Sequence, residues 1–118
     1  MRTPMTYTID LEQEVTDARR DASRYYRRSR KFEREIVHLE AQIELNAENA
    51  AWFAKREDEF PDYAASLLRL NETLRKSIEQ NKRLAPKYRE FGRAAAERKR
   101  SYEVMIAKRR QTWATSTA

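Results

Sequence analysis

Two long runs of residues recur at alternating intervals of four and three positions, and they constrain the fold more than any other feature of the chain. In the first run only Ser29 and Asn46 are polar, and its members are Leu11, Val15, Ala18, Ala22, Tyr25, Ser29, Phe32, Ile36, Leu39, Ile43, Asn46, Ala50 and Phe53. The second run is Phe60, Tyr63, Leu67, Leu70, Leu74, Ser77, Asn81, Leu84, Tyr88, Phe91, Ala95, Arg98, Tyr102 and Met105. A repeat sustained over this length is typical of a coiled-coil seam.

The chain offers few places at which such helices would be interrupted. One Gly and three Pro in 118 residues leave little room for the turns of a β-sandwich or a doubly wound α/β fold. Phe60-Pro61-Asp62 is the main break, because proline removes a helical donor and disfavours the α conformation in the preceding residue. We therefore predict an all-α fold, a long antiparallel coiled-coil hairpin that forms a single domain over residues 10–113.

The expected boundaries follow from the same signals. The first arm is predicted over residues 10–59, the turn near 60–62 and the second arm over 62–113, with a bend at Pro86; residues 1–9 are expected to be an extended arm and 114–118 a frayed tail. Asp10 followed by Gln13 resembles a capping box, which places the first helix start there.

The pairing of the two arms stays open between two registers. If the residue numbers of facing pairs sum to 120, small residues repeatedly meet large ones, as in Ala50 with Leu70. If they sum to 127, Asn46 meets Asn81, and a buried Asn pair fixes register in coiled coils.

Catalytic and cofactor chemistry find little support in the composition. The chain has no Cys, and His38 is its only His, so the Glu35-x-x-His38 element lacks the second His that a di-iron bundle requires. Phosphate-binding loops need several glycines, and only Gly92 is available. We expect no enzymatic activity, no cofactor, no metal and no small-molecule substrate. No apolar run approaches a membrane span or a secretion signal, which favours an intracellular location or one inside a particle.

Basic residues concentrate in two stretches that the hairpin would bring together. Residues 19–34 and residues 82–100 each hold eight Lys or Arg against two acidic residues, whereas residues 35–81 hold five against ten. The hairpin would therefore have a basic base and an acidic turn end. The candidate surface for an acidic protein or for nucleic acid is Arg19, Arg20, Arg24, Tyr26, Arg27, Arg28, Arg30, Lys31, Arg93, Lys99 and Arg100, with the Tyr26 ring available for stacking. A solvated helix face is the simpler explanation of such a run.

A second apolar stripe lies off the predicted seam. Its members are Val37, Ala41, Leu45 and Trp52, with Leu68 as a further one. Such a stripe indicates a surface for a protein partner or for self-association. The alternative is an elongated three-helix bundle, with turns at 46–49 and 85–86, in which the stripe belongs to the core.

The sequence as a whole favours a non-enzymatic coiled-coil interaction or assembly protein, acting as a rigid spacer, adaptor or scaffold in a larger complex. The alternative function is sequence-nonspecific nucleic-acid binding through the basic residues, which would contact the phosphate backbone.

Overall fold

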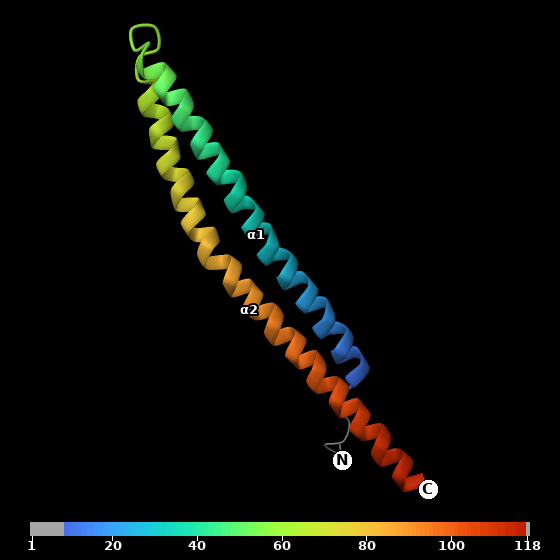
Figure 1. Ribbon diagram of the computed structural model, residues 1–118. Coiled ribbons are helices and arrows are strands. Elements are labelled where there is room, and N and C mark those ends of the chain that lie inside the picture. Colours follow the sequence, from blue (N-terminus) through green and yellow to red (C-terminus); the bar gives the residue numbers. More distant parts are fainter. Residues whose placement is uncertain (1–8, 118) are drawn as a thin grey trace, which may run out of the picture. The chain divides into compact units, whose positions relative to one another are not determined.

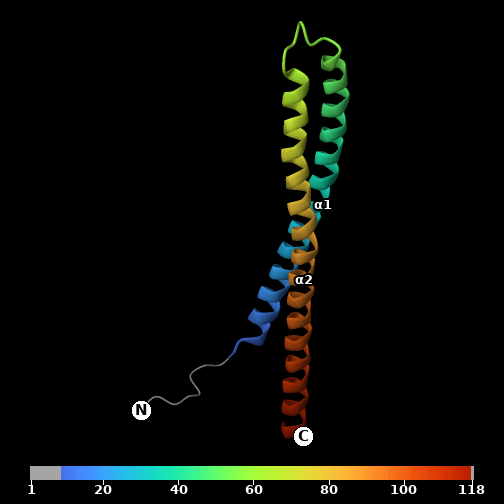
Figure 2. The same cartoon turned by 90° about the vertical axis from the view of Figure 1, so that its left-hand side faces the viewer.

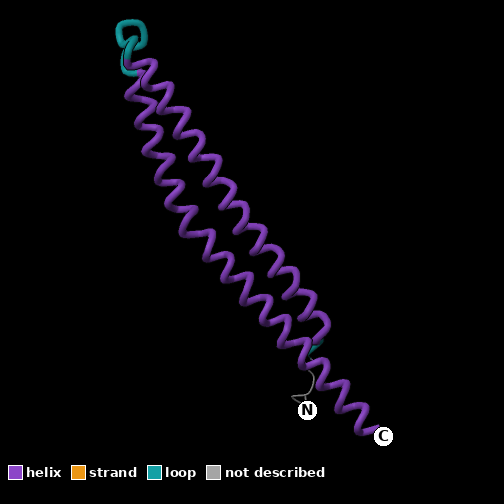
Figure 3. The backbone as a smooth tube through the Cα atoms, viewed as in Figure 1, coloured by secondary structure: helices purple, strands orange, loops and turns teal. Residues whose placement is uncertain are grey.

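The computed structural model describes residues 9–117, and these form an all-α helical hairpin. Helix α1 spans Leu11–Ala54 and helix α2 spans Tyr63–Thr117, with no strand among the described residues (Figures 1 and 3). Both helices are continuous through 46–49 and 85–86 respectively, so the three-helix alternative is wrong. Of the predicted N-terminal arm, residues 1–8 lie outside the described part of the chain.

The hairpin divides into two compact units. The turn unit is Arg28–Lys87, and the base unit combines Met1–Arg27 with Tyr88–Ala118. In the turn unit the end of α1 and the start of α2 run side by side in opposite directions (Figures 1 and 2). The base unit pairs the first turns of α1 with the second half of α2, as the ion pair between Asp21 and Arg98 shows.

Helix α1 begins at the position that its capping signals predict. The Gln13 N–H donates to the Asp10 carboxylate over 3.1 Å, and the Glu14 N–H donates to the Asp10 carbonyl over 3.0 Å. Only half of the capping box forms, because the Gln13 side chain donates forward to Asp17. Glu12 and Glu14 in the first turn add negative charge where the helix dipole favours it.

The turn is longer than the sequence suggested. Helix α1 ends at Ala54 rather than near residue 59, and residues 55–62 form turns with a bend at Phe60. Asp62 has a φ of 62°, and its N–H donates to the Glu57 carboxylate over 2.9 Å. Its carbonyl then accepts the first bond of α2, from the Ser66 N–H. At the other end α2 continues to Thr117, beyond the predicted end at residue 113.

The predicted row on α1 is the face that α1 buries. Leu11, Val15, Ala18, Ala22, Ser29, Asn46 and Ala50 are buried, and Tyr25, Phe32, Ile36, Leu39, Ile43 and Phe53 are half-buried. The predicted buried face of α1 is therefore the face that packs in both units.

Helix α2 buries a row that differs from the predicted one at every second position. Leu70, Phe91 and Met105 are 46%, 45% and 50% exposed, whereas Asn71 and Gly92 are buried. The row that is buried or half-buried is Ala64, Leu67, Asn71, Leu74, Ile78, Asn81, Ala85, Tyr88, Gly92, Ala95, Lys99, Tyr102 and Ile106, and Leu84 is half-buried beside it. The alternation of three and four is kept, but every second position moves by one residue, so that Ala64, Asn71 and Gly92 face α1 in place of Tyr63, Leu70 and Phe91.

A polar layer fixes the register of the turn unit. Asn46 Nδ2 donates to Asn71 Oδ1 over 3.0 Å, and Asn71 Nδ2 donates to the Ile43 carbonyl over 3.1 Å. Gln42 Nε2 donates to Asn46 Oδ1 over 3.0 Å. Asn71 is fully buried, and its amide bonds directly to these partners. In the turn unit neither predicted register is correct, because the partner of Asn46 is Asn71, not Asn81, and Leu70 does not face Ala50 in the buried row.

Two further polar residues are buried in the turn unit. Ser29 Oγ donates to the Ala85 carbonyl over 2.7 Å, next to Pro86, through which α2 continues. Asn81 is 8% exposed, and its Nδ2 has no hydrogen-bond partner among the described residues. An unpaired buried donor of this kind lowers the free energy of unfolding by about 1–3 kcal/mol.

Candidate interaction surfaces

The predicted basic surface is divided between the two units. Arg19, Arg20, Arg24, Arg27, Arg93, Lys99 and Arg100 belong to the base unit, whereas Arg28, Arg30 and Lys31 belong to the turn unit. All of these except Lys99 are exposed. The basic residues of the base unit therefore come from both helices.

Within the base unit some of this charge is balanced locally. Arg98 pairs with Asp21 across the two helices at 3.3 Å, and Arg93 pairs with Glu90 at 3.2 Å. The Lys99 ammonium lies 3.5 Å from Glu103. Arg20, Arg24 and Arg27 lie on one exposed face of α1 at intervals of four and three, and Arg27 donates to Ser23 Oγ over 3.3 Å. These three guanidinium groups form a short row at helical spacing.

Tyr26 of α1 packs against helix α2. Its side chain is half-buried, and its ring covers Gly92 of α2. Ring atoms Cδ1 and Cε1 lie 2.9 Å from the position that a Cβ at residue 92 would take. The Tyr26 ring therefore packs between the helices of the base unit, and its role in stacking on a base stays a prediction.

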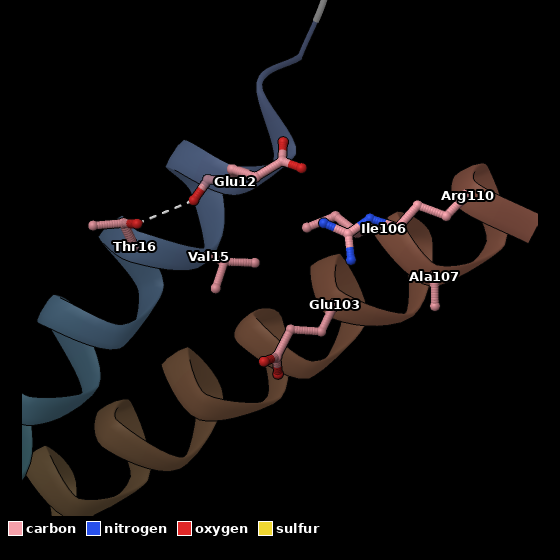
Figure 4. A pocket seen from close by; sticks show the side chains of 7 residues that line it. All are labelled: Glu12, Val15, Thr16, Glu103, Ile106, Ala107 and Arg110. Carbon is pink, nitrogen blue, oxygen red and sulfur yellow. Dashed lines mark hydrogen bonds between the residues drawn. The ribbon is translucent and has the colours of Figure 1, made fainter. Parts of the chain in front are cut away.

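An open groove of about 440 Å³ lies at the start of α1 in the base unit (Figure 4). It is lined by Glu12, Val15, Thr16, Glu103, Ile106, Ala107 and Arg110. Figure 4 shows Val15 and Ile106 between the two helices, while the Thr16 hydroxyl donates to the Glu12 carbonyl over 3.1 Å. Its lining contains two carboxylates, one guanidinium, one hydroxyl and three apolar side chains. Such a mixture is expected where the edge of a helix pair meets solvent.

The apolar stripe lies outward on the turn unit. Val37, Leu45, Trp52 and Leu68 are 68%, 50%, 48% and 51% exposed, and Ala41 is exposed as well. The first four predicted members belong to α1, whereas Leu68 is an exposed residue of α2. The core of the turn unit therefore does not use this stripe, which it would have to do in a three-helix bundle.

Trp52 also belongs to an aromatic cluster at the turn, which the spacing of the apolar residues does not predict. Its ring centroid lies 5.0 Å from that of Phe53 and 6.0 Å from that of Phe60, and Phe53 lies 4.5 Å from Tyr63. The Arg56 guanidinium is 3.8 Å from the centroid of Trp52 and donates to the Trp52 carbonyl over 2.9 Å. The tryptophan is thus held in place while about half of its surface stays in solvent.

The last features to place are His38, possible metal ligands and possible membrane-spanning segments. His38 is exposed on α1, and residues 9–117 contain no group of three or more His, Asp or Glu side chains placed to hold a metal ion. Within the described range, neither α1 nor α2 contains an apolar segment long enough to cross a bilayer.

Comparison of the chain with protein-family models, with curated proteins and with solved structures finds no match.

Proposed function

We propose that this chain is a non-enzymatic interaction and assembly protein that binds another protein chain through the apolar stripe of the turn unit. The observation that carries the proposal is the exposure of Val37, Leu45 and Trp52 on the side of α1 that α2 leaves uncovered. Large apolar side chains in a row on a helix are typical of a helical recognition surface.

The shape of the grooves and the positioned ring of Trp52 both favour binding to another protein chain. Their hollows are open grooves along the helix margins, whereas small-molecule sites are mostly concave and apolar with a few convergent polar groups. The held tryptophan at the end of the stripe suits binding, because hot spots are enriched in Trp and lose little side-chain entropy when the ring is already positioned.

Affinity purification from the native source tests the proposal. The tagged chain, its Leu45→Glu variant and a Gln80→Glu control of equal added charge would be compared, each with and without nuclease. Gln80 is exposed on α2. We expect a protein that survives nuclease to be retained by the wild type and the control and lost from Leu45→Glu. A set of partners indifferent to Leu45→Glu would overturn the proposal.

Nucleic-acid binding is the second candidate, and the row of Arg20, Arg24 and Arg27 favours it. Binding to phosphates would weaken steeply between about 50 and about 200 mM salt. Replacing the three arginines by Gln should lower the slope of log K against log salt by about three. The matched control replaces Arg69, Arg75 and Lys76 of α2, which are also exposed. Equal losses in both triple variants, or no salt dependence, would remove this candidate.

A further inference from the structure

The apolar stripe is the centre of a longer row with an internal symmetry. Seven exposed residues of α1 follow one another at intervals of 4, 3, 4, 4, 3 and 4, and we call them the outer row: Arg30, Arg34, Val37, Ala41, Leu45, Glu48 and Trp52. With 3.6 residues per turn these intervals keep the row on one face. Ala41 lies two residues from both Leu39 and Ile43 of the buried row, so it points away from α2.

The intervals are the same in both directions from Ala41. Four residues away on either side stand Val37 and Leu45, and both are apolar. Seven residues away stand Arg34 and Glu48, which are opposite in charge. Among the described residues, neither Arg34 nor Glu48 forms an ion pair. When two copies of the row lie antiparallel, apolar residues therefore face apolar residues and Arg34 faces Glu48.

The outermost positions, eleven residues from Ala41, continue the pattern. They are Arg30 and Trp52, a guanidinium and an aromatic ring that suit a cation–π contact. The Trp52 ring already accepts one such contact from Arg56 at 3.8 Å, and it remains 48% exposed. A second guanidinium would therefore meet a ring that is held in place.

From this pattern we infer that two copies of the chain associate through their outer rows, with the α1 helices antiparallel and a two-fold axis at Ala41. Each residue then faces the one whose number makes a sum of 82, so every complementary pair forms twice. The small side chain at the axis lets the helices approach to about 8–10 Å. A parallel pair is disfavoured, because Arg34 would face Arg34 and Glu48 would face Glu48. A partner surface of a single charge, such as a nucleic acid, is disfavoured because it would repel either Arg34 or Glu48.

This inference rests on the proposed function and names its partner as a second copy. Light scattering and sedimentation equilibrium of the wild type should give twice the 14.1 kDa of one chain. Arg34→Glu and Glu48→Arg should each raise the dimer dissociation constant at least about tenfold, because each creates two like-charged pairs. The double variant should restore the wild-type value to within about threefold. Controls of equal charge change are Lys76→Glu and Glu72→Arg, exposed on α2.

Disulfide formation tests the position of the axis. The chain has no Cys, so one introduced residue reports alone. Ala41→Cys should oxidise to a covalent dimer, whereas Val37→Cys should not, because the two copies of residue 37 would be about 12 Å apart along the helices. Cross-linking of both variants alike, or failure of the charge exchange, would overturn the inference. A monomeric wild type whose native partner is lost in Leu45→Glu would overturn it while leaving the proposed function intact; a monomer with no such partner would remove both.

Discussion

The ring of Tyr26 covers Gly92, leaving no room for a Cβ between the two helices of the base unit. Glycine in the middle of a helix lowers the free energy of unfolding by about 1 kcal/mol relative to alanine. Its presence in α2 is therefore explained by the neighbouring helix, since the tyrosine packs where a larger residue would have to stand.

The sign of Gly92→Ala should depend on Tyr26. In the wild type we expect the variant to lower the free energy of unfolding by about 1 kcal/mol, because the clash outweighs the gain in helix propensity. In a Tyr26→Ala background the same change should raise it by about 0.5–1 kcal/mol. Urea unfolding followed by circular dichroism measures both values. An equal effect in both backgrounds would show that the two residues are not coupled.

The Asn46–Asn71 layer should show strong coupling as well. Asn71→Leu leaves the buried Asn46 amide without its acceptor, so we expect a loss of about 2 kcal/mol. Replacing both residues by Leu should recover most of that loss, because no polar group is then left unpaired. A double-mutant cycle of urea midpoints tests this, with the exposed Asn49→Ala as a control that stays within about 0.5 kcal/mol. Additive losses would contradict the pairing.

Asn81 is the position at which a polar residue lowers stability without a compensating bond. Because its Nδ2 is buried and has no partner among the described residues, Asn81→Leu should raise the free energy of unfolding by about 1 kcal/mol. Thermal unfolding should shift upward by a few degrees, in line with about 2–8 °C per kcal/mol for small domains. Destabilisation by this variant would mean that the Asn81 amide does have a partner in solution.

The left-handed backbone of Asp62 gives a test at the turn. Asp62→Ala should lower the free energy of unfolding by about 1 kcal/mol, since residues with a Cβ disfavour a positive φ and Asp tolerates it better than Ala. Asp62→Gly should leave stability unchanged or slightly raised, because glycine adopts this region readily. Chemical denaturation of the two variants side by side distinguishes the backbone effect from loss of the side chain, which would affect both equally.

The spacing of the sequence was enough to predict two helices, the buried face of α1 and the outward stripe. It was not enough for the frame of α2, because ranking positions by hydrophobicity favours Leu70 and Phe91 over Asn71 and Gly92. Asn71 is buried where it accepts a hydrogen bond from the Asn46 amide of α1, and Gly92 is buried beneath the Tyr26 ring of α1. Apolar spacing predicts a buried position only when its residue is apolar, and Asn71 and Gly92 of α2 are not.

The turn also bears on domain swapping between two copies of the chain. If residues 55–62 straightened into one continuous helix, α1 of one molecule could pair with α2 of another, and the Asn46–Asn71 bond would form between molecules as well as within one. Pro61 opposes that straightening, because it offers no N–H to the Glu57 carbonyl and its ring clashes with it. Pro61 thus disfavours the continuous helix that such a domain swap would require.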